Sequence, residues 1–180
     1  MGVIRYVIGF LILCLLPVLA AGDDVGAAQR GASLLKPFKA SLQAALRQGL
    51  EDGPVAAINA CRVQAPAIAR SLSRGSVRMG RASHRLRNPA NLGPAWVTPL
   101  VRRYSNATAA GQPVTVALPS NRMGYVEPIY MQSQCLACHG KDIDAPVAAQ
   151  LQALYPQDQA AGFEKGEFRG VFWVEFPQGL

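Results

Sequence analysis

The chain has 180 residues, 50% of them hydrophobic, and its 18 Lys and Arg against 11 Asp and Glu give a formal net charge of +7 at pH 7. This length is sufficient for one domain with a real core, but it excludes an additional kinase or transmitter module. The basic balance leaves nucleic acid, an anionic membrane and an acidic partner protein as candidate partners.

The first residues have the layout of a secretory signal peptide. Met1–Arg5 is a short basic segment, Tyr6–Leu19 is almost purely apolar, and small residues around Ala20 provide cleavage sites. This apolar run of about 14 residues is short for a membrane-spanning helix, which needs about 20. An uncleaved anchor is the alternative, and it would be the chain's contact with a membrane. We therefore assign residues 1–22 to the signal and residues 23–180 to a single domain. Export argues against nucleic acid as a partner.

Two helical segments are expected after the signal. Residues 31–49 carry apolar side chains at helical spacing, with Ser33 as N-cap and a glycine at the end as the stop. A second helix spans residues 54–64, and an Ala-Pro step breaks or restarts it to give a short piece over residues 65–72. Cys61 projects from the apolar face of the second helix.

The middle of the chain is irregular and rich in arginine. Residues 74–92 predict a short strand followed by a loop, and residues 94–110 predict a helix. His84 lies in the loop, where its ordinary interpretation is a hydrogen-bonded loop residue. The arginines of this region are Arg70, Arg74, Arg78, Arg81, Arg85, Arg87, Arg102 and Arg103.

The pattern then changes to strands. Residues 114–118 and 124–131 predict two strands joined by a turn, residues 146–154 a short helix, and residues 168–176 a closing strand. The chain contains no internal repeat and no low-complexity tract. Helices first, then strands with helices between them, predict an α+β fold around an antiparallel sheet.

The segment Cys135-Leu136-Ala137-Cys138-His139 matches the attachment signature of a c-type haem. Positions i and i+3 of a helical turn face the same side, so both sulfurs can reach the two vinyl groups along one haem edge. His139 is then held beside the ring as a proximal ligand of the iron. The pattern predicts one covalently attached haem c per chain.

Other interpretations of these residues compete with haem. A thioredoxin-like redox pair requires a βαβ context, whereas the residues before Cys135 predict an antiparallel strand. A zinc site could use Cys61, Cys135, Cys138 and His139, although structural zinc sites usually separate their ligand pairs. A disulfide is a further alternative. The exported context and the specific five-residue pattern favour haem.

Cys61 is the remaining thiol of the mature chain if the motif cysteines form thioethers. It is either a small buried hydrophobe or an axial thiolate on the haem face opposite His139, with its pKa lowered by the metal. The other candidates for that place are His84, Met79, Met123 and Met131, or no residue at all.

The arginines have two functional interpretations. They form a docking face for an acidic redox partner, or one or two of them pair with haem propionates while most are solvated surface residues. We favour the second.

The ordered set of short motifs resembles a family of exported monohaem c-type cytochromes with a PAS-like fold. The same domain serves as the periplasmic sensor region of some bacterial histidine kinases. The set covers about residues 50–176 in the right order. The matching stretches are Ala60-Cys61, Ala65-Pro66-Ala67-Ile68-Ala69, Leu86-Arg87-Asn88-Pro89-Ala90-Asn91, Pro128-Ile129, the haem motif through Gly140, Tyr155-Pro156, Asp158-Gln159-Ala160, Gly162 and Arg169-Gly170.

This resemblance implies a five-stranded antiparallel sheet flanked by helices, with haem against the sheet. It implies thioether bonds to Cys135 and Cys138, with His139 as one axial ligand and the cysteine at the position of Cys61 as the second. It also implies a periplasmic location in a bacterium. The sequence before the Leu-Arg-Asn-Pro stretch departs from the family, and His84 there leaves bis-histidine ligation open.

A haem with a protein ligand on each face has no site for a substrate, so one-electron chemistry is expected rather than catalysis. Thiolate ligation lowers the reduction potential by donating electron density to ferric iron. The function is therefore electron transfer with a redox partner protein, or redox or haem-based sensing through a sensor partner. The alternatives are a CO- or NO-binding protein and a peroxidase-like protein with an open distal site.

Overall fold

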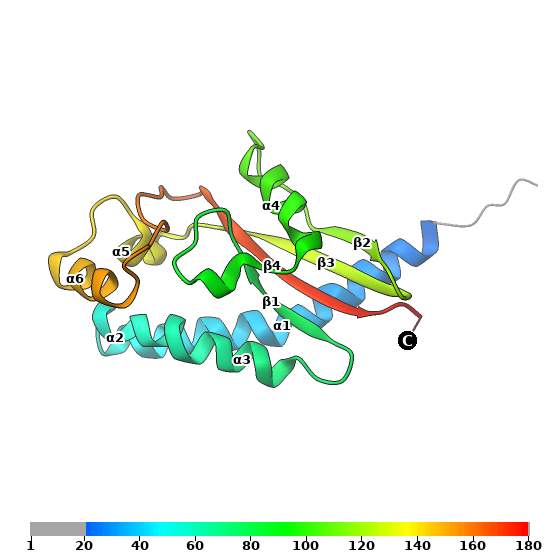
Figure 1. Ribbon diagram of the computed structural model, residues 1–180, viewed down its shortest axis with the longest axis horizontal. Helices are drawn as coiled ribbons and strands as arrows, with labels where there is room; N and C mark the ends of the chain where they lie inside the picture. Colours follow the sequence, from blue (N-terminus) through cyan, green and yellow to red (C-terminus); the bar gives the residue numbers. More distant parts are fainter. Residues whose placement is uncertain (1–20, 180) are drawn as a thin grey trace, which may run out of the picture.

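The computed structural model describes residues 21–179, which form an antiparallel sheet between helices (Figure 1). The predicted signal, residues 1–22, lies outside the described residues except for its last two. Among the described helices, none combines the length and the apolar character needed to span a membrane.

The sheet has four strands in the described part of the chain, in the order β1-β4-β3-β2, and each neighbouring pair is antiparallel. The strands are β1 (Arg78–Ala82), β2 (Val114–Leu118), β3 (Arg122–Tyr130) and β4 (Phe168–Pro177). The expected α+β class and the antiparallel sheet are confirmed. The fifth strand of the PAS-like arrangement is not found among residues 21–179.

Alternating side chains give the sheet two buried faces, as expected for successive residues of a strand. Along β4, Val171 and Trp173 belong to the core on one face, whereas Phe172, Val174 and Phe176 belong to the core on the other. Both faces of this strand are apolar because helices cover both.

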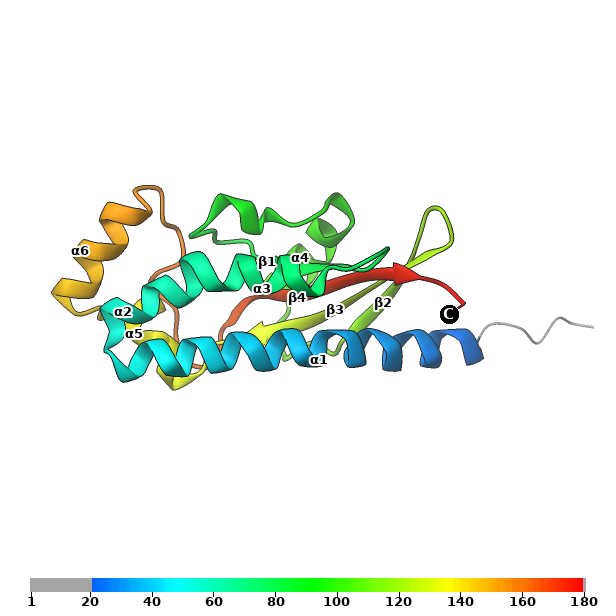
Figure 2. The ribbon, with the colours of Figure 1, turned by 90° about the horizontal axis from the view of Figure 1, so that it is seen from below.

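The long helix α1 (Ala21–Glu51) runs along one face of the sheet (Figure 2). Leu35 and Phe38 are 0% and 1% exposed and belong to the same core cluster as Tyr125 and Val174. Full burial of such a side chain contributes about 1.5–3 kcal/mol. Gly31 permits this close approach, because a Cβ there would lie 2.3 Å from Cγ of Tyr125.

Both predicted ends of this helix are wrong. Ala21, the first described residue, is already helical, so Ser33 is not the N-cap, and Pro37 lies inside the helix. The predicted stop, Gly49, is also helical. A Cβ at Gly49 would lie 2.8 Å from Cα of Ala57, so the glycine allows α1 to approach the next helix closely. Packing against the sheet outweighs the local start and stop signals.

The other face of the sheet is covered by two short elements, not by the single helix predicted over residues 94–110. They are η3 (Ala95–Val97) and α4 (Thr98–Ser105). Pro99 stands in the first turn of α4, where its missing N–H removes no helical hydrogen bond. Val97 and Val101 are buried in one core cluster with Val126.

The remaining helical segments include those at the end of the sheet where β3 ends and β4 begins (Figure 1). The segments are α2 (Pro54–Asn59), η1 (Ala60–Gln64), α3 (Ala65–Leu72), η2 (Pro89–Leu92), η4 (Ser133–Cys135), α5 (Leu136–His139) and α6 (Ala145–Leu154). After α1 and a turn at residues 52–53, the segments α2, η1 and α3 follow one another without a break, and α6 contacts α2.

Candidate functional site

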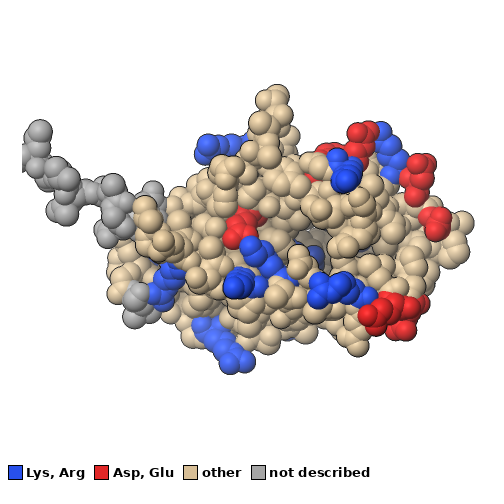
Figure 3. All heavy atoms as spheres, turned by 180° about the vertical axis from the view of Figure 1, so that it is seen from behind, with Lys and Arg blue, Asp and Glu red and all other residues tan. Residues whose placement is uncertain are grey.

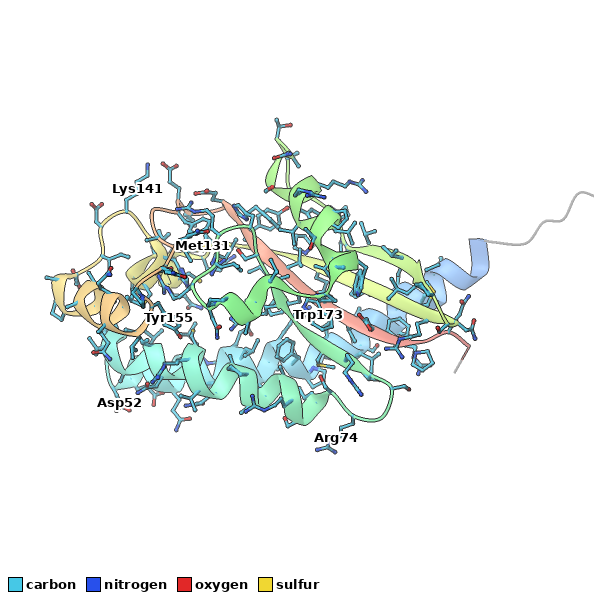
Figure 4. All side chains as sticks on the ribbon, viewed as in Figure 1. Asp52, Arg74, Met131, Lys141, Tyr155 and Trp173 are labelled. Atoms are coloured by element: carbon cyan, nitrogen blue, oxygen red, sulfur yellow. The ribbon has the colours of Figure 1, made fainter. Side chains whose placement is uncertain are left out.

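A large cavity lies at this end of the sheet. It holds about 1020 Å³ of space outside the atoms, a volume that includes space open to solvent. Its lining comes from both the helices and the ends of the strands, including Tyr155 and Met131, which Figure 4 labels in this part of the molecule. Three arginines line the cavity, and no Asp or Glu is among its described lining residues.

The Cys-x-x-Cys-His segment forms one wall of the cavity. Cys135 ends the short turn η4, and Cys138 and His139 lie on the single helical turn α5. All three are half-buried and line the cavity, so the turn presents both thiols to the same space. Burial raises the pKa of the Cys138 thiol, so the unmodified thiol stays protonated at neutral pH.

Gly140 closes this turn. Its N–H donates a hydrogen bond to the Leu136 carbonyl at 2.8 Å. A Cβ at this position would lie 2.6 Å from the same carbonyl oxygen, so glycine is the residue that fits. The chain therefore leaves the helical turn directly after His139.

The His139 ring is held in one orientation. Its Nδ1 lies 2.5 Å from the carbonyl oxygen of Ala160, and because a carbonyl only accepts, Nδ1 carries the proton. Burial, and then the nearby Arg87 and Arg169, lower the pKa of His139 to about 3. The imidazole is therefore neutral, and its Nε2 lone pair is free to bind a metal.

A buried ion pair supports this arrangement. Nε of Arg87 donates to Oδ2 of Asp158 at 2.8 Å, and the same guanidinium donates to the carbonyls of Cys138 at 2.6 Å and Ala160 at 3.2 Å. Oδ1 of Asp158 accepts a hydrogen bond from the Ala160 N–H at 2.7 Å. The pair thus fixes the carbonyl that orients His139.

Cys61 reaches the cavity from the helical layer. It lies in η1, a π-helical turn between α2 and α3, not in the continuous α-helix predicted over residues 54–64. The predicted restart at Ala65 is confirmed, because α3 begins there. Cys61 lines the cavity with the motif cysteines, and single π-helical turns are frequent at functional sites.

Tyr155 is a neighbour of Cys61 in the cavity. Burial, followed by the proximity of Cys61, raises the pKa of the Tyr155 phenol, so it remains protonated. Cys61, Cys135, Cys138 and His139 all line the cavity, yet in the described part of the chain no three His, Cys, Asp or Glu side chains are grouped to hold a metal ion. The geometry thus gives no support to the zinc alternative.

The other candidates for the second ligand lie elsewhere. His84 is exposed and does not line the cavity; it stacks on Phe168, with ring centroids 5.5 Å apart, in a separate shallow hollow. Met79 and Met123 are buried in the core between α1 and the sheet. These three residues are therefore not placed to face a group in the cavity.

Met131 lines the cavity but lies on the His139 side of it. It is buried in one cluster with Ala160 and Phe163, and these residues also contact the His139 ring. Cys61 comes from a different wall, so it is the better placed of the two to oppose His139.

The sequence analysis missed the roles of Arg87, Asp158 and Arg169. The sequence groups Arg87 with the other arginines of the middle region, without singling it out, although it is one of the buried partners that position the motif. A signal was present, because all three residues lie in the short stretches that carry the family resemblance.

Comparisons with known proteins show which fold and family the chain shares. The structure is similar to that of the cyanobacterial heme-protein Tll0287, with a TM-score of 0.62 and 21% sequence identity, covering 88% of this chain and 98% of that one. At this identity the likeness shows the shared fold. No curated protein matches the chain. The profile of the Tll0287-like family matches residues 25–177, and the chain therefore belongs to the Tll0287-like family.

Proposed function

We propose that this chain is an exported c-type haem protein that performs one-electron chemistry. One observation carries the proposal: the two cysteines and the histidine of one short helical segment line the same cavity as a third cysteine from another layer. The similar structure is that of a heme-protein, which supports the same cofactor here. Residues 1–22 support export to the bacterial periplasm.

Each residue of the pocket has a different role in holding one haem c. Cys135 and Cys138 attach it through thioethers, and His139 presents Nε2 to the iron because Nδ1 is engaged by Ala160. Cys61 supplies the second axial ligand as a thiolate. When bound, the haem supplies reversible one-electron chemistry, and a thiolate ligand lowers its reduction potential.

Electron transfer with a redox partner protein is the first form of this proposal. With ligands on both faces there is no place for a substrate, so the protein is proposed not to be an enzyme. His84, the acid–base candidate for a peroxidase-like reaction, lies outside the cavity lining, which disfavours that alternative.

Sensing is the second form, and the π-helical turn at Cys61 favours it. A π-turn holds one more residue than an α-helical turn and sits between two α-helices here, so Cys61 is carried by a locally irregular backbone. A thiolate on such a turn is suited to release from the iron on reduction, which would open the site to CO or NO. The PAS-like character of the fold, as in sensor domains, belongs to this proposal.

Spectroscopy of the matured protein tests the ligand assignment. The protein should carry the mass of one covalent haem and show a low-spin thiolate signature in its ferric EPR and optical spectra. Cys61→Ser should abolish this signature, whereas Met131→Leu and His84→Gln, two other candidate ligands, should keep it. A signature that survives in Cys61→Ser would contradict the ligand assignment, and a matured protein without covalent haem would contradict the proposed function.

A further inference from the structure

The side chains that line the cavity carry more positive charge than the nearby carboxylates neutralise. Arg81, Arg87 and Arg169 line it, and no acidic residue does in the described part of the chain. Arg87 has a carboxylate partner in Asp158. Arg81 and Arg169 take part in none of the ion pairs between described residues. A hollow with basic side chains beside it is visible on the face shown in Figure 3.

Arg169 is held in place by neutral groups. Its Nη1 donates to Oγ of Ser83 at 2.5 Å and to the carbonyl of Arg85 at 3.1 Å, and its guanidinium lies 5.4 Å from the centre of the Phe163 ring. Burial, followed by the proximity of Arg81, lowers the pKa of Arg169 to about 10. The side chain stays charged at neutral pH and is held in a fixed position, and although Asp158 is near enough to favour this charge, Arg169 forms no ion pair with a described residue.

The side chain of Arg81 makes no hydrogen bond or ion pair with any residue in the described range 21–179. Arg81 lies on β1 and pairs with Phe172 of β4. Arg169 lies on β4, three residues before Phe172. Two guanidinium groups that share one cavity repel each other, and a buried charge without a partner is costly. The cavity is therefore incomplete without negative charge.

We propose that Arg81 and Arg169 form an anion site that binds the propionate carboxylates of the haem. This inference rests on the proposed function. A guanidinium binds a carboxylate through two parallel N–H donors. The site uses two of the arginines singled out in the sequence and leaves the others to different roles. Arg85 is engaged by Glu167 and by the carbonyls of Gln159 and Ala161, and the exposed arginines are Arg70, Arg74, Arg78, Arg102 and Arg103.

The test compares matured holoproteins that each lose one positive charge. Arg81→Gln and Arg169→Gln remove the proposed partners, Arg102→Gln removes an exposed arginine, and Arg81→Lys keeps the charge. The readouts are the reduction potential as a function of pH and the propionate bands of the resonance Raman spectrum. The titratable groups His139, Tyr155, Cys61 and Asp158 remain in every variant, so differences between variants report on the arginines.

We expect the propionate pKa to rise by about one unit or more in Arg81→Gln and Arg169→Gln, with shifted propionate bands and a lower reduction potential at neutral pH. Arg81→Lys should restore most of the change, and Arg102→Gln should behave like the wild type. If Arg169→Gln fails to fold because Ser83 loses its partner, Arg81→Gln alone tests the anion site, since the Arg81 side chain makes no hydrogen bond or ion pair with another described residue.

Identical titration and Raman spectra in Arg81→Gln, Arg102→Gln and the wild type would overturn the anion site. The proposed function would survive that result, provided that covalent haem and the thiolate signature are present. Absence of covalent haem from the wild type would instead overturn the proposed function, and with it the inference. The mass of the matured protein separates the two outcomes.

Discussion

The ion pair between Arg87 and Asp158 gives a direct test of what holds the pocket together. Nε of Arg87 lies 2.8 Å from Oδ2 of Asp158, and the two side chains are 9% and 13% exposed. Asp158→Asn keeps the shape of the side chain but removes its charge. The Arg87 guanidinium then remains buried without a counter-charge.

The size of the effect follows from the contacts that remain. Removal of one partner from a buried ion pair costs about 3–5 kcal/mol. Arg87 keeps its hydrogen bonds to the carbonyls of Cys138 and Ala160, which places the expected loss near the lower limit, at about 3 kcal/mol. In a chain of this size each kcal/mol lowers Tm by about 2–4 °C, so Asp158→Asn should melt about 6–12 °C below the wild type.

Thermal unfolding of the matured protein, followed by far-ultraviolet circular dichroism, measures this loss. Lys141→Gln is the matched control, because the ion pair of Lys141 with Glu164 is exposed and its removal should leave Tm unchanged. A Tm of Asp158→Asn within about 2 °C of the wild type would refute this reasoning.

Three further outcomes are expected. Gly170→Ala should lower the free energy of unfolding by about 2 kcal/mol or more in chemical denaturation, since a Cβ would lie 2.3 Å from the Ala82 carbonyl oxygen; unchanged stability would contradict that contact. His84→Gln should leave the ferric optical spectrum and the reduction potential unchanged, because His84 does not line the cavity, and a shifted Soret band would count against its placement. Burial, and then Glu127, raise the pKa of Tyr125 above its ordinary value of 10.0. The folded state therefore holds this proton more tightly, and the associated stability is complete below about pH 10 and decreases above it. Urea midpoints measured between about pH 9 and pH 11 should fall more steeply for the wild type than for Tyr125→Phe, and equal slopes would contradict the shift.

The parts of the site that lie on one short segment could be predicted from the sequence. The motif from Cys135 to His139 needs one helical turn to direct its side chains into one space, and the spacing alone determines that geometry. The strands β2, β3 and β4 were also predictable, because each combines β-branched or aromatic residues with a turn at its end. Cys61 was recognised as a candidate because it is the leftover thiol of the mature chain.

The supporting contacts could not be predicted, because they join distant parts of the chain. Arg87 and Asp158 are 71 positions apart, and a charged residue in an irregular loop gives no local indication of burial. The sequence also gives no indication of the π-helical turn at Cys61, because the periodicity of residues 54–64 fits an ordinary α-helix. The middle of α1 packs against Tyr125 and its neighbours, contacts that a local pattern does not contain.

The charges of the pocket connect the two proposals. Arg87 is neutralised by Asp158, which leaves the positive charges of Arg81 and Arg169 to balance two propionates. A ferric haem retains one net positive charge apart from its propionates, and the thiolate of Cys61 would cancel it. Reduction then adds a negative charge that no group in the described lining offsets, and in a low-dielectric pocket such a charge is costly. Release of Cys61 from the iron together with uptake of a proton by its thiolate would remove that cost. Under the proposed function, the same charge balance that would give a low reduction potential would therefore favour loss of the Cys61 ligand on reduction, at the one π-helical turn of the described chain.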